Sequence, residues 1–249
     1  MAMKNSNTIS VPGVDKDEEY LECEKTWVYD LLIAVAGWFG AYTFLQRGGV
    51  FCNAQTANVV LFSMAIGEGN ISRAIYLLLV IGAYFLGAFV SEYLGKSVKK
   101  LHFLRWDTLL IGIEILTIIV LGFLPADAPD QISQVALNFI CSMQFNTFRQ
   151  MEGVPAATTF VTNHIRQVGH FLAKYVRHRE KKYSDRVKAH GRLILFFIGG
   201  GVASSVACRF FSYRSIWGSA VILLIVFARL FYADISYEKD LLPKVPHGH

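Results

Sequence analysis

The stretch from Gly48 to Phe62 reads GGVFCNAQTANVVLF and lies between two apolar runs of membrane-span character. It opens with two adjacent glycines, which favour a break in a helix, and it carries the polar side chains Asn53, Gln55, Thr56 and Asn58. In hydrocarbon, unpaired polar groups and irregular backbone are costly. This stretch must therefore be shielded by protein or face a watery cavity, and it is the first candidate for a functional site.

The composition predicts an integral membrane protein. Of 249 residues, 53% are hydrophobic and 17% are charged, whereas soluble domains carry about 25% charged residues. The first apolar run begins near Trp27 behind an acidic head, so we expect no cleavable signal peptide. The four cysteines are widely scattered, and their spacing predicts neither a disulfide nor a zinc site. We expect an all-α, polytopic helical bundle.

Eight segments of the chain have membrane character. Six are ordinary apolar spans, near residues 27–44, 71–94, 106–124, 132–148, 193–211 and 216–232. The other two, at 48–64 and 154–175, are more polar. If all eight crossed the membrane, the basic loops at 96–105 and 174–192 would lie on opposite sides, against the positive-inside rule. We therefore expect six spans plus two re-entrant or broken helices, with both basic loops and both termini cytoplasmic in a cell (inner) membrane.

This topology divides the chain into two membrane halves, 26–125 and 131–235, flanked by cytoplasmic tails at 1–25 and 236–249. Each half reads span, polar segment, span, span, so that three crossings turn the second half upside down. Thr56 to Asn58 align with Thr162 to His164 at a constant offset. We therefore consider an inverted repeat, a plan that places the solute site of many transporters between the repeats.

The two polar segments also resemble a known family. Gly49 to Leu61, GVFCNAQTANVVL, is similar to the signature of the YoaK-type family of bacterial membrane proteins of unknown function, which has a Thr-Gly-Asn-like motif after the first span. Thr158 to His164, TTFVTNH, resembles the family's second motif, and the likeness extends from about Trp27 to Tyr232. Ala57 stands where the first motif has Gly, and Asn163-His164 stand where the second has Gly-Asn. The resemblance implies a multispanning fold, and transport as one activity, without a substrate.

Polar side chains in both segments form the expected solute path. They are Asn53, Gln55, Thr56 and Asn58 in the first segment and Thr159, Thr162, Asn163 and His164 in the second, joined by Asn138 and Asn146 from one stripe of the 132–148 span. The alternative is that these groups satisfy backbone freed by the breaks or bond across helices. His164 is either a group that couples transport to protons or a hydrogen-bonded structural histidine.

Glu114 lies well inside its span, where a carboxylate needs a partner or a proton. Arg229, at comparable depth in the last span, is the expected partner. The two form either an ion-coupling site or a buried ion pair.

The sequence therefore predicts a transport protein, carrier or channel, that passes a small polar solute between its halves. The alternative is a non-transporting scaffold or sensor whose basic loop, 174–192, binds lipid or a partner protein. No nucleotide-binding, nucleophile-elbow or metal motif is present, so we expect no enzyme activity, no cofactor and no metal. The expected partners are the bilayer, the solute and anionic lipid at the basic loop, not nucleic acid, and self-association stays open.

Overall fold

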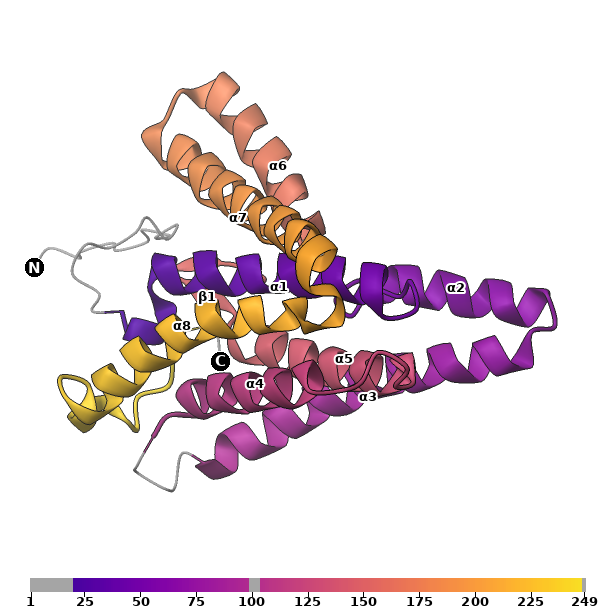
Figure 1. Ribbon diagram of the computed structural model, residues 1–249. Coiled ribbons are helices and arrows are strands. Elements are labelled where there is room, and N and C mark those ends of the chain that lie inside the picture. The colour runs from indigo at the N-terminus through magenta and orange to yellow at the C-terminus, as the bar shows by residue number, and fades with distance from the viewer. Residues whose placement is uncertain (1–19, 99–103, 248–249) are drawn as a thin grey trace, which may run out of the picture.

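A computed structural model describes residues 20–98 and 104–247, and these residues form a helical bundle (Figure 1). The α-helices are α1 (Thr26–Gln46), α2 (Gln55–Gly67), α3 (Ile71–Val98), α4 (Trp106–Gly122), α5 (Asp130–Thr147), α6 (Thr162–His178), α7 (Lys181–Phe211) and α8 (Trp217–Ile235). Short 3-10 helices cover Glu22–Glu24, Ser212–Ile216 and Lys239–Leu241. One pair of two-residue strands, β1 (Gln150–Met151) and β2 (Val154–Pro155), forms an antiparallel hairpin. The predicted all-α class is confirmed.

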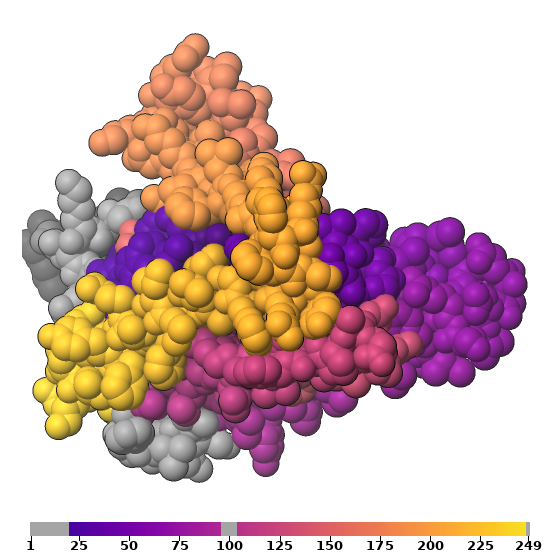
Figure 2. Space-filling model, viewed as in Figure 1, coloured from indigo at the N-terminus to yellow at the C-terminus, as the bar shows by residue number. Residues whose placement is uncertain are grey.

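Several of the helices have the length and the apolar surface of membrane spans. Three helical stretches, Thr26–Gln46, Ile71–Gly95 and Lys181–Ile235, are long and apolar enough to cross a membrane, and the last contains both α7 and α8. Large apolar side chains such as Phe85 and Phe210 face outward. The α2–α3 hairpin forms a lobe on one side of the bundle and the α6–α7 hairpin a second lobe (Figure 2). An apolar exterior of this kind suits lipid, so the chain has the features of a membrane protein.

The two halves contact each other mainly through their first and third helices. α1 lies along α7, and α3 lies along α5, so the first helix of each half packs on the third helix of the other. Within each half α2 packs on α3 and α6 on α7, and α4 meets α8 between the halves. Corresponding helices also run in opposite directions, α1 against α5 and α4 against α8 (Figure 1). This reciprocal pattern is the one that an inverted repeat produces.

Glycines allow these two contacts between the halves to be close. A Cβ atom on Gly200 of α7 would lie 1.9 Å from the carbonyl oxygen of Ala34 in α1. A Cβ atom on Gly87 of α3 would lie 2.2 Å from the carbonyl oxygen of Phe139 in α5. Small residues at such positions let transmembrane backbones touch. The face of α3 that carries Gly87 is therefore the face that packs on α5.

The first polar segment is a broken helix. α1 ends at Gln46, and Gly48 and Gly49 take positive φ angles of 76° and 66°, which L side chains rarely adopt. α2 then continues away from α1 in a similar direction, and α3 returns from its far end (Figure 1). Of the two predicted forms, re-entrant or broken, the first segment therefore has the broken form.

The second polar segment contains a longer irregular stretch. α5 ends at Thr147 and α6 begins at Thr162, with the β1–β2 hairpin between them. The hairpin turns at Glu152 and Gly153, both with positive φ, as a two-residue hairpin turn requires. The helix expected over 154–175 therefore begins later, at Thr162.

The end of α3 and the start of α4, which flank the first basic loop, lie toward the same side of the bundle as the second basic loop and both described chain ends (Figure 1). Glu24 accepts a hydrogen bond from the backbone N–H of His247, and Glu238 accepts one from the backbone N–H of Glu22, so the two described chain ends are tied together there. Residues before Tyr20, the larger part of the expected N-terminal tail, lie outside the described part. Leu21 is buried in the core, so the chain is already packed before α1 begins.

Candidate functional site

The break between α1 and α2 carries a buried polar network that reaches the other half of the molecule. Gln55 Nε2 donates to Asn138 Oδ1 of α5 over 2.7 Å and to the carbonyl of Cys52 over 3.3 Å. Asn58 Nδ2 donates to the carbonyl of Phe51 over 2.8 Å and to Gln55 Oε1 over 3.3 Å. Asn58 and Asn138 are fully buried. Three of the residues predicted for the solute path are thus joined across the interface between the halves.

Gln134, one turn before Asn138 on α5, completes this network. Its Nε2 lies 2.5 Å from the carbonyl oxygen of Arg47 and 2.8 Å from that of Val50, and so satisfies backbone freed by the break. Asn138 Nδ2 in turn donates to the carbonyl of Gln134 over 2.7 Å. Gln134 was not predicted as a site residue, although its place on the Asn138 stripe was a signal that could have identified it.

The other two predicted residues of the first segment have different surroundings. Asn53 Nδ2 donates to the carbonyl of Ala36 over 2.9 Å, and its side chain covers Gly40, so Asn53 fastens the break to α1. Thr56 is exposed on α2. Asn53 therefore has the structural role given above as the alternative to a place on the solute path.

At the second break, His164 is fully buried and bonded on both ring nitrogens. Its Nε2 lies 2.8 Å from the carbonyl oxygen of Ala157, and its Nδ1 lies 2.9 Å from Nδ1 of His190 in α7. Because a carbonyl can only accept, Nε2 carries the proton in the neutral ring, and His190 Nδ1 donates to His164 Nδ1. His190 was missed because it lies in a stretch interpreted as a basic loop.

His164 and Asn58 make the same type of contact in the two halves. Each bonds to a backbone carbonyl seven residues earlier, Ala157 for His164 and Phe51 for Asn58. The alignment that pairs Asn58 with His164 also pairs these two carbonyls. The internal similarity seen in the sequence therefore has a structural counterpart.

The other predicted residues of the second segment differ from one another in burial. Thr159 is fully buried, but Thr162 is exposed and Asn163 accepts a hydrogen bond from Arg166 over 2.9 Å on the surface. Gln144 Nε2 of α5 donates to the carbonyl of Thr158 over 3.3 Å, so α5 contacts both breaks.

Several buried oxygens around α5 have no hydrogen-bond partner in the described part of the chain. They are Asn58 Oδ1, Ser142 Oγ, Gln144 Oε1, Thr158 Oγ1 and Thr159 Oγ1. Buried polar atoms are nearly always paired, so a set of this size near two helix breaks indicates groups that bind water or a solute.

The predicted pairing of Glu114 with Arg229 is wrong. Glu114 is fully buried in α4, and neither carboxylate oxygen has a partner among the described residues. Arg229 is largely exposed, and its Nη2 lies 3.2 Å from Glu22 Oε1. Sequence position gives the depth of a residue along a helix but not the direction it faces. Glu114 points into the bundle, within electrostatic range of Cys141.

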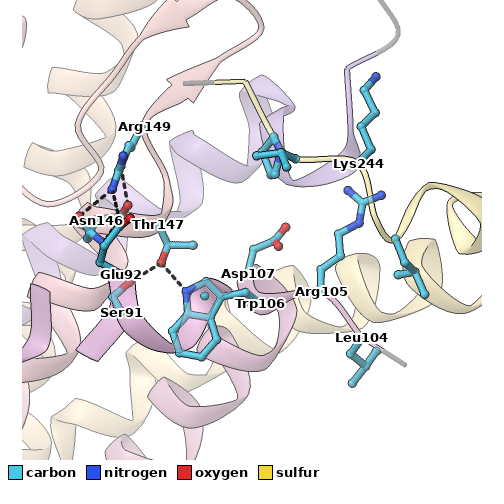
Figure 3. Close-up of a pocket in the computed structure, with 14 residues that line it drawn as sticks. Ser91, Glu92, Leu104, Arg105, Trp106, Asp107, Asn146, Thr147, Arg149 and Lys244 are labelled. Carbon is cyan, nitrogen blue, oxygen red and sulfur yellow. Dashed lines mark hydrogen bonds and ion pairs between the residues drawn. The ribbon is translucent and has the colours of Figure 1, made fainter. Parts of the chain in front are cut away.

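A cavity of about 290 Å³ lies between the end of α3, the start of α4, the end of α5 and the C-terminal residues (Figure 3). Asn146 of α5 and Arg149, which follows α5, line it beside Glu92 of α3. Asn138, Ser142 and Asn146 lie at four-residue intervals on one face of α5, as the sequence predicted. This stripe leads from the cavity, past Ser142 with its unpartnered hydroxyl, to the network at the first break.

The contact between α5 and the first break can be tested by cross-linking. Cys52 Sγ and Cys141 Sγ lie 3.7 Å apart, close enough for a disulfide to form after a small adjustment. With Cys23 and Cys208 replaced by serine, treatment of membranes with iodine is expected to join the two, and mass spectrometry of a digest detects the linked peptides. Moving the α5 thiol by one residue, with Cys141→Ser and Ser142→Cys, turns it away and should largely abolish the product. Equal yields from both variants would contradict the contact.

Comparison with known proteins yields a family but no characterised relative. No curated protein and no solved structure matches the chain. The family described as Protein of unknown function (DUF1275) matches residues 30–229, most of the chain, in agreement with the YoaK-type motifs. The chain belongs to this family.

Proposed function

We propose that the chain is a transport protein of the inner membrane that passes a small polar solute between its two halves. The observation that carries the proposal is the polar stripe of α5, which joins the cavity at Asn146 to the buried network of Gln55, Asn58 and Asn138. Broken helices that meet at a repeat interface are a recurrent form of solute site in transporters. The path requires neither catalysis nor a cofactor.

The proposed path is closed where α3 packs on α5, and this closure favours a carrier over a channel. The cavity opens on one side, whereas α3 and α5 touch beside Ser142, where a Cβ on Gly87 would lie 3.0 Å from the Ser142 Cβ. A solute can pass this point only if the two helices separate. Glu114 supplies a buried carboxylate without a protein partner, and we assign it to proton or cation coupling.

The topology proposed for this carrier has both termini and both basic loops in the cytoplasm. The positive-inside rule supports it, because the helix ends that flank the first basic loop lie toward the same side of the bundle as the second basic loop. Exposed basic side chains of 174–192, among them Arg177, Lys181 and Lys188, would then contact anionic lipid of the cytoplasmic leaflet.

The proposal is tested with purified protein in lipid vesicles and a panel of radiolabelled small polar solutes. We expect saturable uptake of at least one solute that increases with an inward proton gradient. Glu114→Gln, which keeps the shape but removes the titratable group, is expected to reduce gradient-driven accumulation at least ten-fold while leaving exchange down a solute gradient intact.

The scaffold alternative predicts a different result. Absence of flux for every solute, together with partner proteins that are captured only when residues 174–192 are intact, would replace transport by that function. Flux that does not saturate would indicate a channel.

A further inference from the structure

The cavity beside α5 contains a buried acidic group that neither the stripe nor the two breaks explain. Asp107, in the first turn of α4, is 6% exposed, and its Oδ2 has no hydrogen-bond partner in the part of the chain that the structure describes. Its carboxylate points into the cavity, between Thr147 and Arg149 on one side and Arg105 on the other (Figure 3). A buried carboxylate oxygen without a partner is costly, so a ligand for it is to be expected.

Both arginines that line the cavity form ion pairs with other carboxylates, although Arg105 Nε and Nη1 have no hydrogen-bond partner among the described residues. Arg149 Nη2 lies 3.0 Å from Glu92 Oε2. Arg105 forms ion pairs with Asp234 over 3.5 Å and with Glu238 over 3.3 Å. Neither arginine forms an ion pair with Asp107, so the carboxylate remains available to a cationic ligand.

Neither the Cys23 thiol nor the N-terminus of α4 takes the place of such a ligand. Burial raises the pKa of the Cys23 thiol well above its ordinary value, and the charge of Asp107 and a hydrogen bond to it raise this pKa further, so the thiol stays neutral beside Asp107. An acidic residue in the first turn of a helix often serves the helix N-terminus. Here Oδ2 accepts no hydrogen bond from the backbone N–H groups of α4, so that role leaves the oxygen unused.

The walls that surround Asp107 are held in place. Trp106 Nε1 donates to Thr147 Oγ1 over 2.9 Å, and Thr147 is 3.0 Å from the hydroxyl of Ser91, which joins α4, α5 and α3. Thr108 Oγ1 donates to Asp234 Oδ2 over 2.7 Å on the other side of Asp107. A rigid frame of this kind keeps the carboxylate oriented without a ligand, which reduces the entropy cost of binding.

Other unpartnered polar atoms in the bundle also favour a ligand that donates hydrogen bonds. The unpartnered atoms at Asn58, Ser142, Gln144 and Glu114 are all oxygens that can accept a hydrogen bond. A solute that brings donors can therefore bind to each of them, whereas a solute with acceptors alone finds no donor at Asn58 Oδ1 or Gln144 Oε1.

We propose that this cavity binds a small organic cation with a primary ammonium group, whose N–H donates to Asp107 Oδ2. The ammonium supplies a charged donor for the unpartnered Oδ2 and further donors for the oxygens along α5. The inference rests on the proposed transport function and deepens it by naming the class of solute that enters the path.

Binding of three ligands of equal size tests the charge preference. Isothermal titration of the full chain in detergent is carried out with butylammonium, butanol and butyrate. Butylammonium is expected to bind at one site at least ten-fold more tightly than butanol, and butyrate is expected not to bind. Equal binding of butylammonium and butanol, or binding of butyrate in preference, would overturn the proposal even without a variant.

The assignment to Asp107 is tested with Asp107→Asn, which keeps the shape and removes the charge. It is expected to weaken butylammonium binding at least ten-fold, whereas Asp127→Asn, at an exposed position between α4 and α5, should leave it unchanged. Butylammonium binding that survives Asp107→Asn at full strength excludes this site. Titration needs no flux, so binding without transport in vesicles would refute the proposed function alone, and transport that is indifferent to Asp107 would refute the inference alone.

Discussion

Replacing Gly200 by alanine is expected to prevent α1 and α7 from packing and to destabilise the protein by about 3 kcal/mol or more. The added Cβ would lie 1.9 Å from the carbonyl oxygen and 2.6 Å from the carbonyl carbon of Ala34. Both are backbone atoms, so no side chain can rotate away, and the two helices must separate. Because this contact joins the two halves of the molecule, we expect the variant to unfold at a markedly lower temperature in detergent, as measured by circular dichroism.

The adjacent glycine provides a matched control. A Cβ on Gly199 meets no heavy atom within 4 Å, so Gly199→Ala adds the same methyl group to the same helix without a clash. Alanine is the better helix former by up to about 1 kcal/mol, and Gly199→Ala should be neutral or stabilising. Equal unfolding temperatures for the two variants would show that α1 and α7 are farther apart than described.

The repeat extends this prediction to the other half. Gly87→Ala, in the corresponding contact of α3 with α5, is expected to be destabilising like Gly200→Ala, since its Cβ would lie 2.2 Å from the carbonyl oxygen of Phe139. Gly82→Ala, with open space around it, serves as its control.

Much of the fold followed from hydropathy alone, because the length of an apolar run sets the length of a membrane helix. The runs expected at 27–44 and 71–94 became α1 and α3 with small changes at their ends. The run expected at 193–211 is the apolar part of a longer helix that already begins at Lys181. Hydropathy marks where a chain enters hydrocarbon, whereas a helix can continue into water, so this boundary could not be read from apolarity.

The candidate site was predictable only where periodicity fixed the face of a helix. The spacing of Asn138 and Asn146 placed them on one stripe of α5, and the structure connects this stripe to Gln55 and Asn58. No such pattern fixed the direction of Arg229, and the expected partner of Glu114 was wrong for that reason. The cavity at Asp107 is built by α3, α4, α5 and the C-terminal residues, and no local pattern in the sequence brings these together.

Asn58→Leu is expected to reduce solute flux in vesicles at least a hundred-fold. Leucine has nearly the shape of asparagine but offers neither the unpartnered Oδ1 to a solute nor the Nδ2 to the carbonyl of Phe51 and to Gln55 Oε1. Each buried acceptor left without a donor costs about 1–3 kcal/mol, so Gln55 is expected to reorient and to lose its bond with Asn138 as well. The variant therefore removes the part of the network that joins the two halves.

A control on the same turn separates loss of the path from loss of the helix. Thr56→Val replaces an exposed polar side chain of α2 by an apolar one of the same shape, and flux should stay within two-fold of the unmodified chain. Butylammonium binding at Asp107 checks the fold of Asn58→Leu, since that cavity lies at the other end of the α5 stripe. Flux that survives Asn58→Leu in a protein that still binds butylammonium would remove Asn58 from the path and leave the network a structural device that holds the broken helix against α5.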